Sequence, residues 1–244
     1  MYLTGRLIGY LLMGIIVIPM RLIYGNKKFE IKNAENLKTL NGRSIFLASN
    51  HIKPRNRFLK LLSMPYDAYI GRAALKKLGY YSTALTSYDA GKRNKGSKLS
   101  KGEKIKELLI KGMIKSIDLI PLNRNETDPD TMRQLKVRLD AGNLGIGIFP
   151  EGTFFRGYRK NRKLHGGVAI LAKRYELPIL PIYIDAYNLN MPVTVSFGTP
   201  ILNPKDSLEV STIIRMEWNS LRNQIQNNRS NGISIENAEE LVHA

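Results

Sequence analysis

The clearest pattern of secondary structure in the chain lies in the stretch IDLIPLNRNETDPDTMRQLKVRLDAGNLGIGIF, residues 117–149. It contains two short apolar runs bounded by turn-forming residues, at 117–122 and 144–149, and such runs are typical of buried strands. The segment between them, residues 128–139, has a helical pattern. Strands that alternate with helices in this way predict an α/β layer fold with a largely parallel sheet.

The same alternation continues on both sides of this stretch. Further strands are predicted at 44–49, 68–71, 178–184 and 193–198, and further helices at 55–62, after 71 as far as 78, at 165–175 and at 208–225. Residues 87–106 are rich in Gly, Ser and Lys, which indicates a solvated loop. We therefore expect an α/β protein with a mostly parallel central sheet flanked by helices.

The N-terminus carries an uncharged run, LIGYLLMGIIVIPM at 7–20, between Arg6 and Arg21. A helix that crosses a bilayer needs about 20 apolar residues, so this run is short for a full crossing. It predicts a membrane-associating helix that is amphipathic or half-inserted, and a buried first core helix is the alternative. We expect two parts, an N-terminal membrane anchor at 1–25 and a single domain at 26–244.

Composition narrows the classes of function. The chain has no cysteine, which excludes thiol nucleophiles, disulfides and thiolate metal sites. Its net charge of +18 predicts a polyanionic partner, which is a nucleic acid, an anionic membrane, or an acidic protein or phosphate ligand. The sequence contains no recognised nucleic-acid module, and its basic residues lack the interleaved aromatic side chains expected for base stacking. We therefore expect anionic membrane lipid as the partner and no nucleic acid.

Chemically distinctive residues follow or flank the predicted strands. Residues 49–51 are Ser-Asn-His, 123–124 are Asn-Arg, 149–153 are FPEGT, and 177–181 are LPILP. Ligands of α/β sheets bind beyond the carboxyl ends of the strands, so these four groups are expected to converge on one cleft. A histidine there is a natural general base, because its ordinary pKa is near 6.5. His51 is the candidate.

These segments resemble the glycerolipid acyltransferase family, which includes bacterial lysophosphatidic acid acyltransferases. The resemblance rests on FPEGT at 149–153, IPLNR at 120–124 and LPILPI at 177–182, and it extends over about residues 44–200. It implies transfer of a fatty acyl group from acyl-CoA or acyl carrier protein to the free hydroxyl of lysophosphatidic acid or a related lysophospholipid, giving phosphatidic acid. It also implies a place in phospholipid biosynthesis at the cytoplasmic face of the cell membrane, without a metal or other cofactor.

The family's first block, N-H-x-x-x-x-D, is only partly matched. Asn50 and His51 fit it, so the resemblance makes His51 the general base, but the place of the aspartate is taken by Asn56. An asparagine can accept a hydrogen bond from the imidazole but supplies no charge. Two explanations stay open. Another carboxylate, such as Asp67 or Asp89, orients His51, or the chain is a catalytically impaired relative that still binds lipid.

The resemblance also assigns residues to the substrate. Arg124 would bind the phosphate of the lysophospholipid, since guanidinium groups make bidentate bonds to phosphate oxygens. Glu151, Gly152 and Thr153 would line the acceptor site, with anchoring of the turn as the alternative for Glu151. The family usually has an arginine directly after EGT, but this chain has phenylalanine there, and Arg156 is the nearest replacement. A different lipid acceptor therefore remains an alternative.

Overall fold

The computed structural model describes residues 29–52, 66–87, 118–122, 129–153, 155, 157–188 and 191–230, with the single positions 102, 111 and 114. The anchor expected at 1–25, the helix expected at 55–62 and nearly all of the loop expected at 87–106 lie outside these residues. None of the helices in the described part of the chain is long and apolar enough to cross a membrane.

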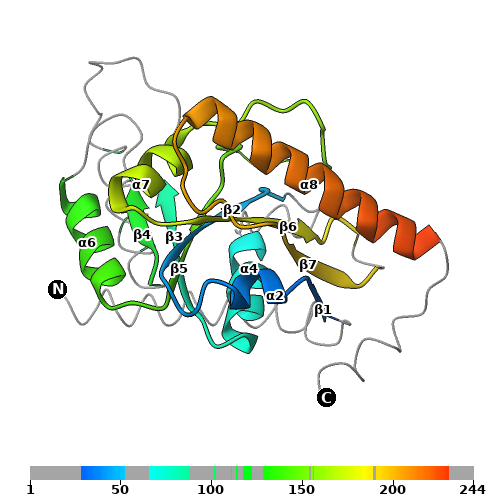
Figure 1. Cartoon of the computed structure of the whole chain (residues 1–244), viewed down its shortest axis with the longest axis horizontal. Coiled ribbons are helices and arrows are strands. Elements are labelled where there is room, and N and C mark those ends of the chain that lie inside the picture. The colour runs from blue at the N-terminus through cyan, green and yellow to red at the C-terminus, as the bar shows by residue number, and fades with distance from the viewer. Residues whose placement is uncertain are drawn as a thin grey trace.

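Seven strands form one sheet in the order β1-β7-β6-β2-β5-β3-β4 (Figure 1). They are β1 (Phe29–Lys32), β2 (Ile45–Ser49), β3 (Tyr81–Ser87), β4 (Ile120–Leu122), β5 (Leu144–Ile148), β6 (Ile179–Asp185) and β7 (Val193–Phe197). The five strands from β6 to β4 are mutually parallel. Strand β7 is antiparallel to β6 and pairs in parallel with β1. The expected α/β fold with a mostly parallel sheet is confirmed.

Helices cover both faces of the sheet. They are α2 (Glu35–Lys38), α4 (Tyr66–Lys77), α6 (Pro129–Asp140), α7 (Gly167–Tyr175) and α8 (Ser207–Ser230). Strand β2 shows how the two faces divide, because its side chains alternate. Ile45 and Leu47 pack in the core cluster that includes residues of α2 and α4, whereas Phe46 and Ala48 pack with residues of α6, α7 and α8. A strand buried on both faces is continuously apolar, as residues 45–48 are.

One predicted strand is wrong, and two strands were not predicted. Residues 68–71 belong to α4, where Asp67, Ile70 and Ala74 are all buried at the spacing of one helix face. Strand β1 lies in a stretch too charged to give an apolar run. Strand β3 has the sequence YSTALTS, and its buried Thr83 is accommodated by a hydrogen bond from its hydroxyl to the Asp118 carbonyl, at 2.8 Å. A buried strand with few large apolar residues gives a weak signal in the sequence.

The parallel strands bring several of the predicted groups to one edge of the sheet. Ala48 of β2 is paired with Ile148 of β5, so the residues that follow these two strands leave the sheet side by side. The LPILP block behaves differently. Residues 177–178 lie at the amino end of β6, where the Pro178 carbonyl accepts a hydrogen bond from the Phe46 N–H. The expectation that all four groups share one cleft is therefore wrong for this block, whose strand reaches the carboxyl edge only at Asp185.

Candidate active site

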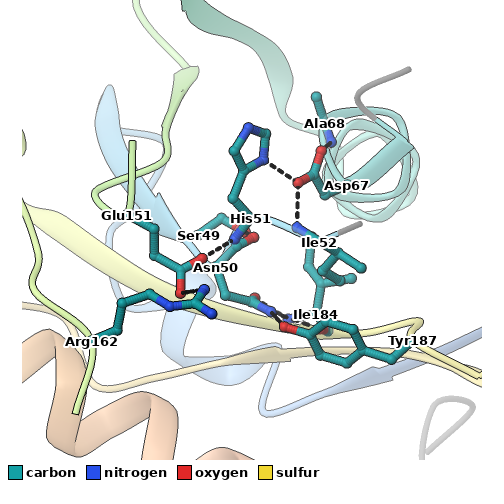
Figure 2. Close-up of polar contacts among 10 residues, drawn as sticks. All are labelled: Ser49, Asn50, His51, Ile52, Asp67, Ala68, Glu151, Arg162, Ile184 and Tyr187. Atoms are coloured by element: carbon teal, nitrogen blue, oxygen red, sulfur yellow. Dashed lines mark hydrogen bonds and ion pairs between the residues drawn. The ribbon is translucent and has the colours of Figure 1, made fainter. Parts of the chain in front are cut away.

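His51 follows β2 at the carboxyl edge of the sheet, and its ring nitrogen Nδ1 is hydrogen-bonded to the Asp67 carboxylate (Figure 2). Asp67 lies in the first turn of α4 and is fully buried. Its two oxygens also accept main-chain N–H bonds from Ile52 and Ala68, each 2.8 Å long. These donors, together with the positive end of the helix dipole, compensate a charge that has no contact with solvent.

The carboxylate of Asp67 determines the tautomer of His51. Because Asp67 accepts a hydrogen bond from the Nδ1–H group, Nε2 is the ring nitrogen that can take a proton from another molecule. The ring also stacks on Phe149, with centroids 4.2 Å apart and an angle of 24° between the planes. Only 11% of the His51 side chain is exposed. An imidazole held by a carboxylate at one nitrogen and by an aromatic ring on its face is suited to general base catalysis.

This pairing bears on the missing aspartate of the first block. Asn56 itself lies outside the described residues, as does Asp89. The carboxylate that meets His51 is that of Asp67, sixteen positions further along the chain. Of the two explanations left open by the sequence, the structure supports the one in which a more distant carboxylate orients the histidine.

Glu151 follows β5 and connects His51 to the loop beyond it (Figure 2). Its Oε2 accepts a 2.7 Å hydrogen bond from the His51 main-chain N–H, and its Oε1 is 2.7 Å from Nη1 of Arg162. Burial raises the pKa of the Glu151 carboxyl, while the N–H of His51 and the guanidinium of Arg162 oppose that rise. Both oxygens are engaged by protein donors, which fits the alternative that Glu151 anchors the turn.

The rest of the EGT turn is shaped by a second histidine. Gly152 has a φ of +65°, and a Cβ at this position would lie 3.0 Å from Cδ2 of His165. The N–H of His165 donates to the carbonyl of Pro150 at 2.7 Å, which holds the two segments together. Glycine is therefore required here both by its backbone conformation and by the close approach of His165. Thr153, the last residue of the block, is exposed.

Asn50 joins the exits of β2 and β6, a role that the sequence did not indicate. Its amide nitrogen donates to the carbonyl of Ile184 at 3.0 Å and to the hydroxyl of Tyr187 at 3.3 Å. Its amide oxygen accepts from the N–H of Ile184 at 2.7 Å. The Asn50 side chain therefore bonds to the main chain of Ile184 in β6 in the way that a neighbouring strand would. These bonds fix the position of Asn50, which directly precedes His51 (Figure 2).

A small cavity lies between α4 and the sheet, next to Asp67 and Phe149. Its volume is about 40 Å³, and its walls include Leu47, Gly71, Leu75 and Ala84. A space of this size holds a water molecule rather than a lipid chain.

Arg124 and Arg156, which were expected to bind the substrate phosphate, lie outside the described residues. Within the described ranges, no group of three or more His, Asp or Glu side chains is arranged to hold a metal ion.

Comparison with known proteins adds a family match. Residues 84–185 match the family model described as Acyltransferase, which represents glycerolipid acyltransferases. The matched range begins within β3 and ends with the last residue of β6, so it contains the FPEGT block but covers less than half of the chain. A search of curated proteins found no match. The match over this range supports acyl transfer to a lipid as the general activity.

Proposed function

We propose that the chain transfers a fatty acyl group from acyl-CoA or acyl carrier protein to the free hydroxyl of lysophosphatidic acid or a related lysophospholipid. The observation that carries this proposal is the buried pairing of His51 with Asp67. His51 follows β2, and the neighbouring strand β5 leads to Glu151, which lies in the range that matches the acyltransferase family model. A catalytically impaired relative would be expected to lack such a pair. We place the reaction at the cytoplasmic face of the membrane, where the charge of +18 attracts anionic lipid.

In the proposed reaction the acceptor hydroxyl gives its proton to Nε2 of His51 as its oxygen attacks the thioester carbonyl. A carbon–oxygen bond forms and the carbon–sulfur bond breaks, so the products are phosphatidic acid and a thiol. The thiolate leaving group then takes this proton from the imidazolium and leaves as the thiol. Asp67 stabilises the positive charge that His51 carries between these two steps. Arg124 and Arg156 would bind the phosphate of the acceptor, and no cofactor beyond the acyl donor is required.

The test is acceptor-dependent release of thiol from palmitoyl-CoA, or from palmitoyl acyl carrier protein, by the full chain on anionic vesicles. Because the chain contains no cysteine, a thiol reagent detects only the product. We expect release with lysophosphatidic acid, and loss of release in His51→Ala while vesicle binding persists. A panel of lysophospholipids and glycolipids identifies the preferred acceptor. Undiminished release by His51→Ala would contradict the mechanism.

A further inference from the structure

Arg162 differs from the other basic residues of the segment between β5 and α7. Its side chain is 9% exposed, whereas Arg159, Lys160 and Lys163 are all exposed. It lies against the ring of Phe155, and its Nη1 donates to Oε1 of Glu151 at 2.7 Å. A guanidinium group is rarely buried to this extent unless it is paired with an opposite charge.

The pairing of Arg162 continues directly to the proposed base. Glu151 receives Arg162 on one oxygen and the His51 N–H on the other, and both contacts are 2.7 Å long. Hydrogen bonds that involve charged groups are about twice as strong as neutral ones. Nη2 of Arg162 is buried without a hydrogen-bond partner among the residues that the structure describes. Among these residues, Glu151 therefore provides the hydrogen bond that orients the guanidinium.

We infer that Arg162 is a positioning residue for the acyl transfer proposed above, acting through Glu151 on the main chain of His51. The inference depends on the proposed function, because it assumes that His51 is the base. Arg162 keeps the Glu151 carboxylate in place, and Glu151 in turn fixes the residue that carries the imidazole. Phe149, on which the imidazole stacks, is two residues before Glu151. A displaced turn would therefore disturb both the stacking on Phe149 and the hydrogen bond from the His51 N–H to Glu151.

The burial of Glu151 explains why a cation is needed at this position. Burial raises the pKa of its carboxyl, and Arg162 is one of the groups that oppose the rise. The other charged or titratable groups around Glu151 are His51, Tyr158 and Tyr187, and Arg215 and Arg222 of α8 interact with Tyr158. Without Arg162, Glu151 becomes protonated at a higher pH and accepts the His51 N–H less strongly.

The experiment compares Arg162→Met with Arg162→Lys in the thiol-release assay over a range of pH. We expect Arg162→Met to lower kcat by about 10- to 100-fold, because small displacements of a catalytic group are costly. KM for the acceptor should stay within about twofold if Arg162 acts through Glu151 and not on the substrate itself. The acid limb of the pH profile should move to higher pH. Arg162→Lys, which keeps the charge, should recover most of kcat and return the limb toward its original position.

Two further variants separate positioning from other roles. Arg133→Met makes the same change of charge on an exposed side chain of α6 and should leave kcat unchanged. In Glu151→Gln the amide oxygen can still accept the His51 N–H but does not titrate, so adding Arg162→Met to it should not move the acid limb further. An Arg162→Met protein with wild-type kcat, or with a raised KM and unchanged kcat, would overturn the inference.

Folding and catalysis are distinguished by measuring thermal unfolding of every variant. If Arg162→Met does not fold, Arg162→Gln repeats the test, because it keeps a donor to Glu151 without the charge. His51→Ala is included in the same assay. Full activity of His51→Ala would overturn the proposed function, whereas an inactive His51→Ala beside a normal Arg162 variant would overturn this inference alone.

Discussion

Asp67 places a fully buried carboxyl group against the imidazole of His51, whose side chain is only 11% exposed. Asp67 accepts hydrogen bonds from His51, Ile52 and Ala68, so its position is fixed by the fold. Asp67 therefore leaves Nε2 as the ring nitrogen of His51 that can accept a proton. This arrangement can be tested one side chain at a time.

At the residue scale, we predict that Asp67→Asn lowers kcat by about 10²- to 10⁴-fold. The corresponding change in a serine protease costs about 10⁴, because the histidine loses its correct tautomer. Asn56→Asp is the matched comparison, since it creates a carboxylate at the position expected from the family block. Because Nδ1 is already paired with Asp67, this variant should stay within about twofold of the wild-type rate. The kcat of both variants, measured beside wild type, checks the prediction, and an Asn56→Asp protein that gains activity would contradict it.

Individual site residues differed in how well the sequence predicted them. His51 and Glu151 were predicted from their motifs, and the structure brings them within 2.7 Å. Asp67 was only one of two candidates, because it lies sixteen positions after His51, whereas the family block places its aspartate five positions after the histidine. Arg162 was indistinguishable from its basic neighbours, since burial of one cation among several depends on where the loop packs.

At the scale of elements, the exits of β2 and β6 are held together by one side chain. Asn50 satisfies both the N–H and the carbonyl of Ile184, at 2.7 and 3.0 Å. We predict that Asn50→Ala destabilises the protein by about 1–3 kcal/mol for each buried group that it leaves unpaired. Asn36→Ala, which removes a single hydrogen bond to the Phe197 carbonyl, should cost less. Thermal or urea unfolding of the two variants measures the difference, and equal stabilities would contradict the assigned role of Asn50.

Helices and strands with strong periodicity were predicted, and those stabilised by polar contacts were not. The helix at 128–139 and the strands at 144–149 and 178–184 agree with α6, β5 and β6 to within about two residues. Strand β3 has small and polar buried residues, whose partners, such as the Asp118 carbonyl, are 35 positions away. Such partners are not visible in a local pattern.

At the scale of the whole molecule, alternation of elements predicted the fold class but not the strand order. The reversal between β6 and β7 has a local cause. Only residues 186–192 connect these strands, and parallel strands need a crossover of about a dozen residues or more. The position of β1 beside β7 depends instead on a pairing between Phe29 and Val193 that no short-range signal specifies.

The net charge of +18 predicts how the whole molecule responds to salt. Each basic residue close to an anionic surface contributes about 1 kcal/mol of attraction, and this attraction weakens beyond about 8 Å at physiological ionic strength. We predict that the full chain sediments with vesicles containing phosphatidylglycerol and that binding falls as salt is raised. Vesicles of phosphatidylcholine alone are the control and should bind less. Equal binding to both kinds of vesicle at low salt would contradict an electrostatic contribution.

We propose that His51 removes the proton from the acceptor hydroxyl. The decisive measurement is a single turnover of radiolabelled palmitoyl-CoA with lysophosphatidic acid, in which label in phosphatidic acid is measured for wild type and for His51→Ala. We predict labelled phosphatidic acid with wild type and a rate lower by about 10²- to 10⁴-fold for His51→Ala. Equal rates of labelling by the two proteins would contradict the claim.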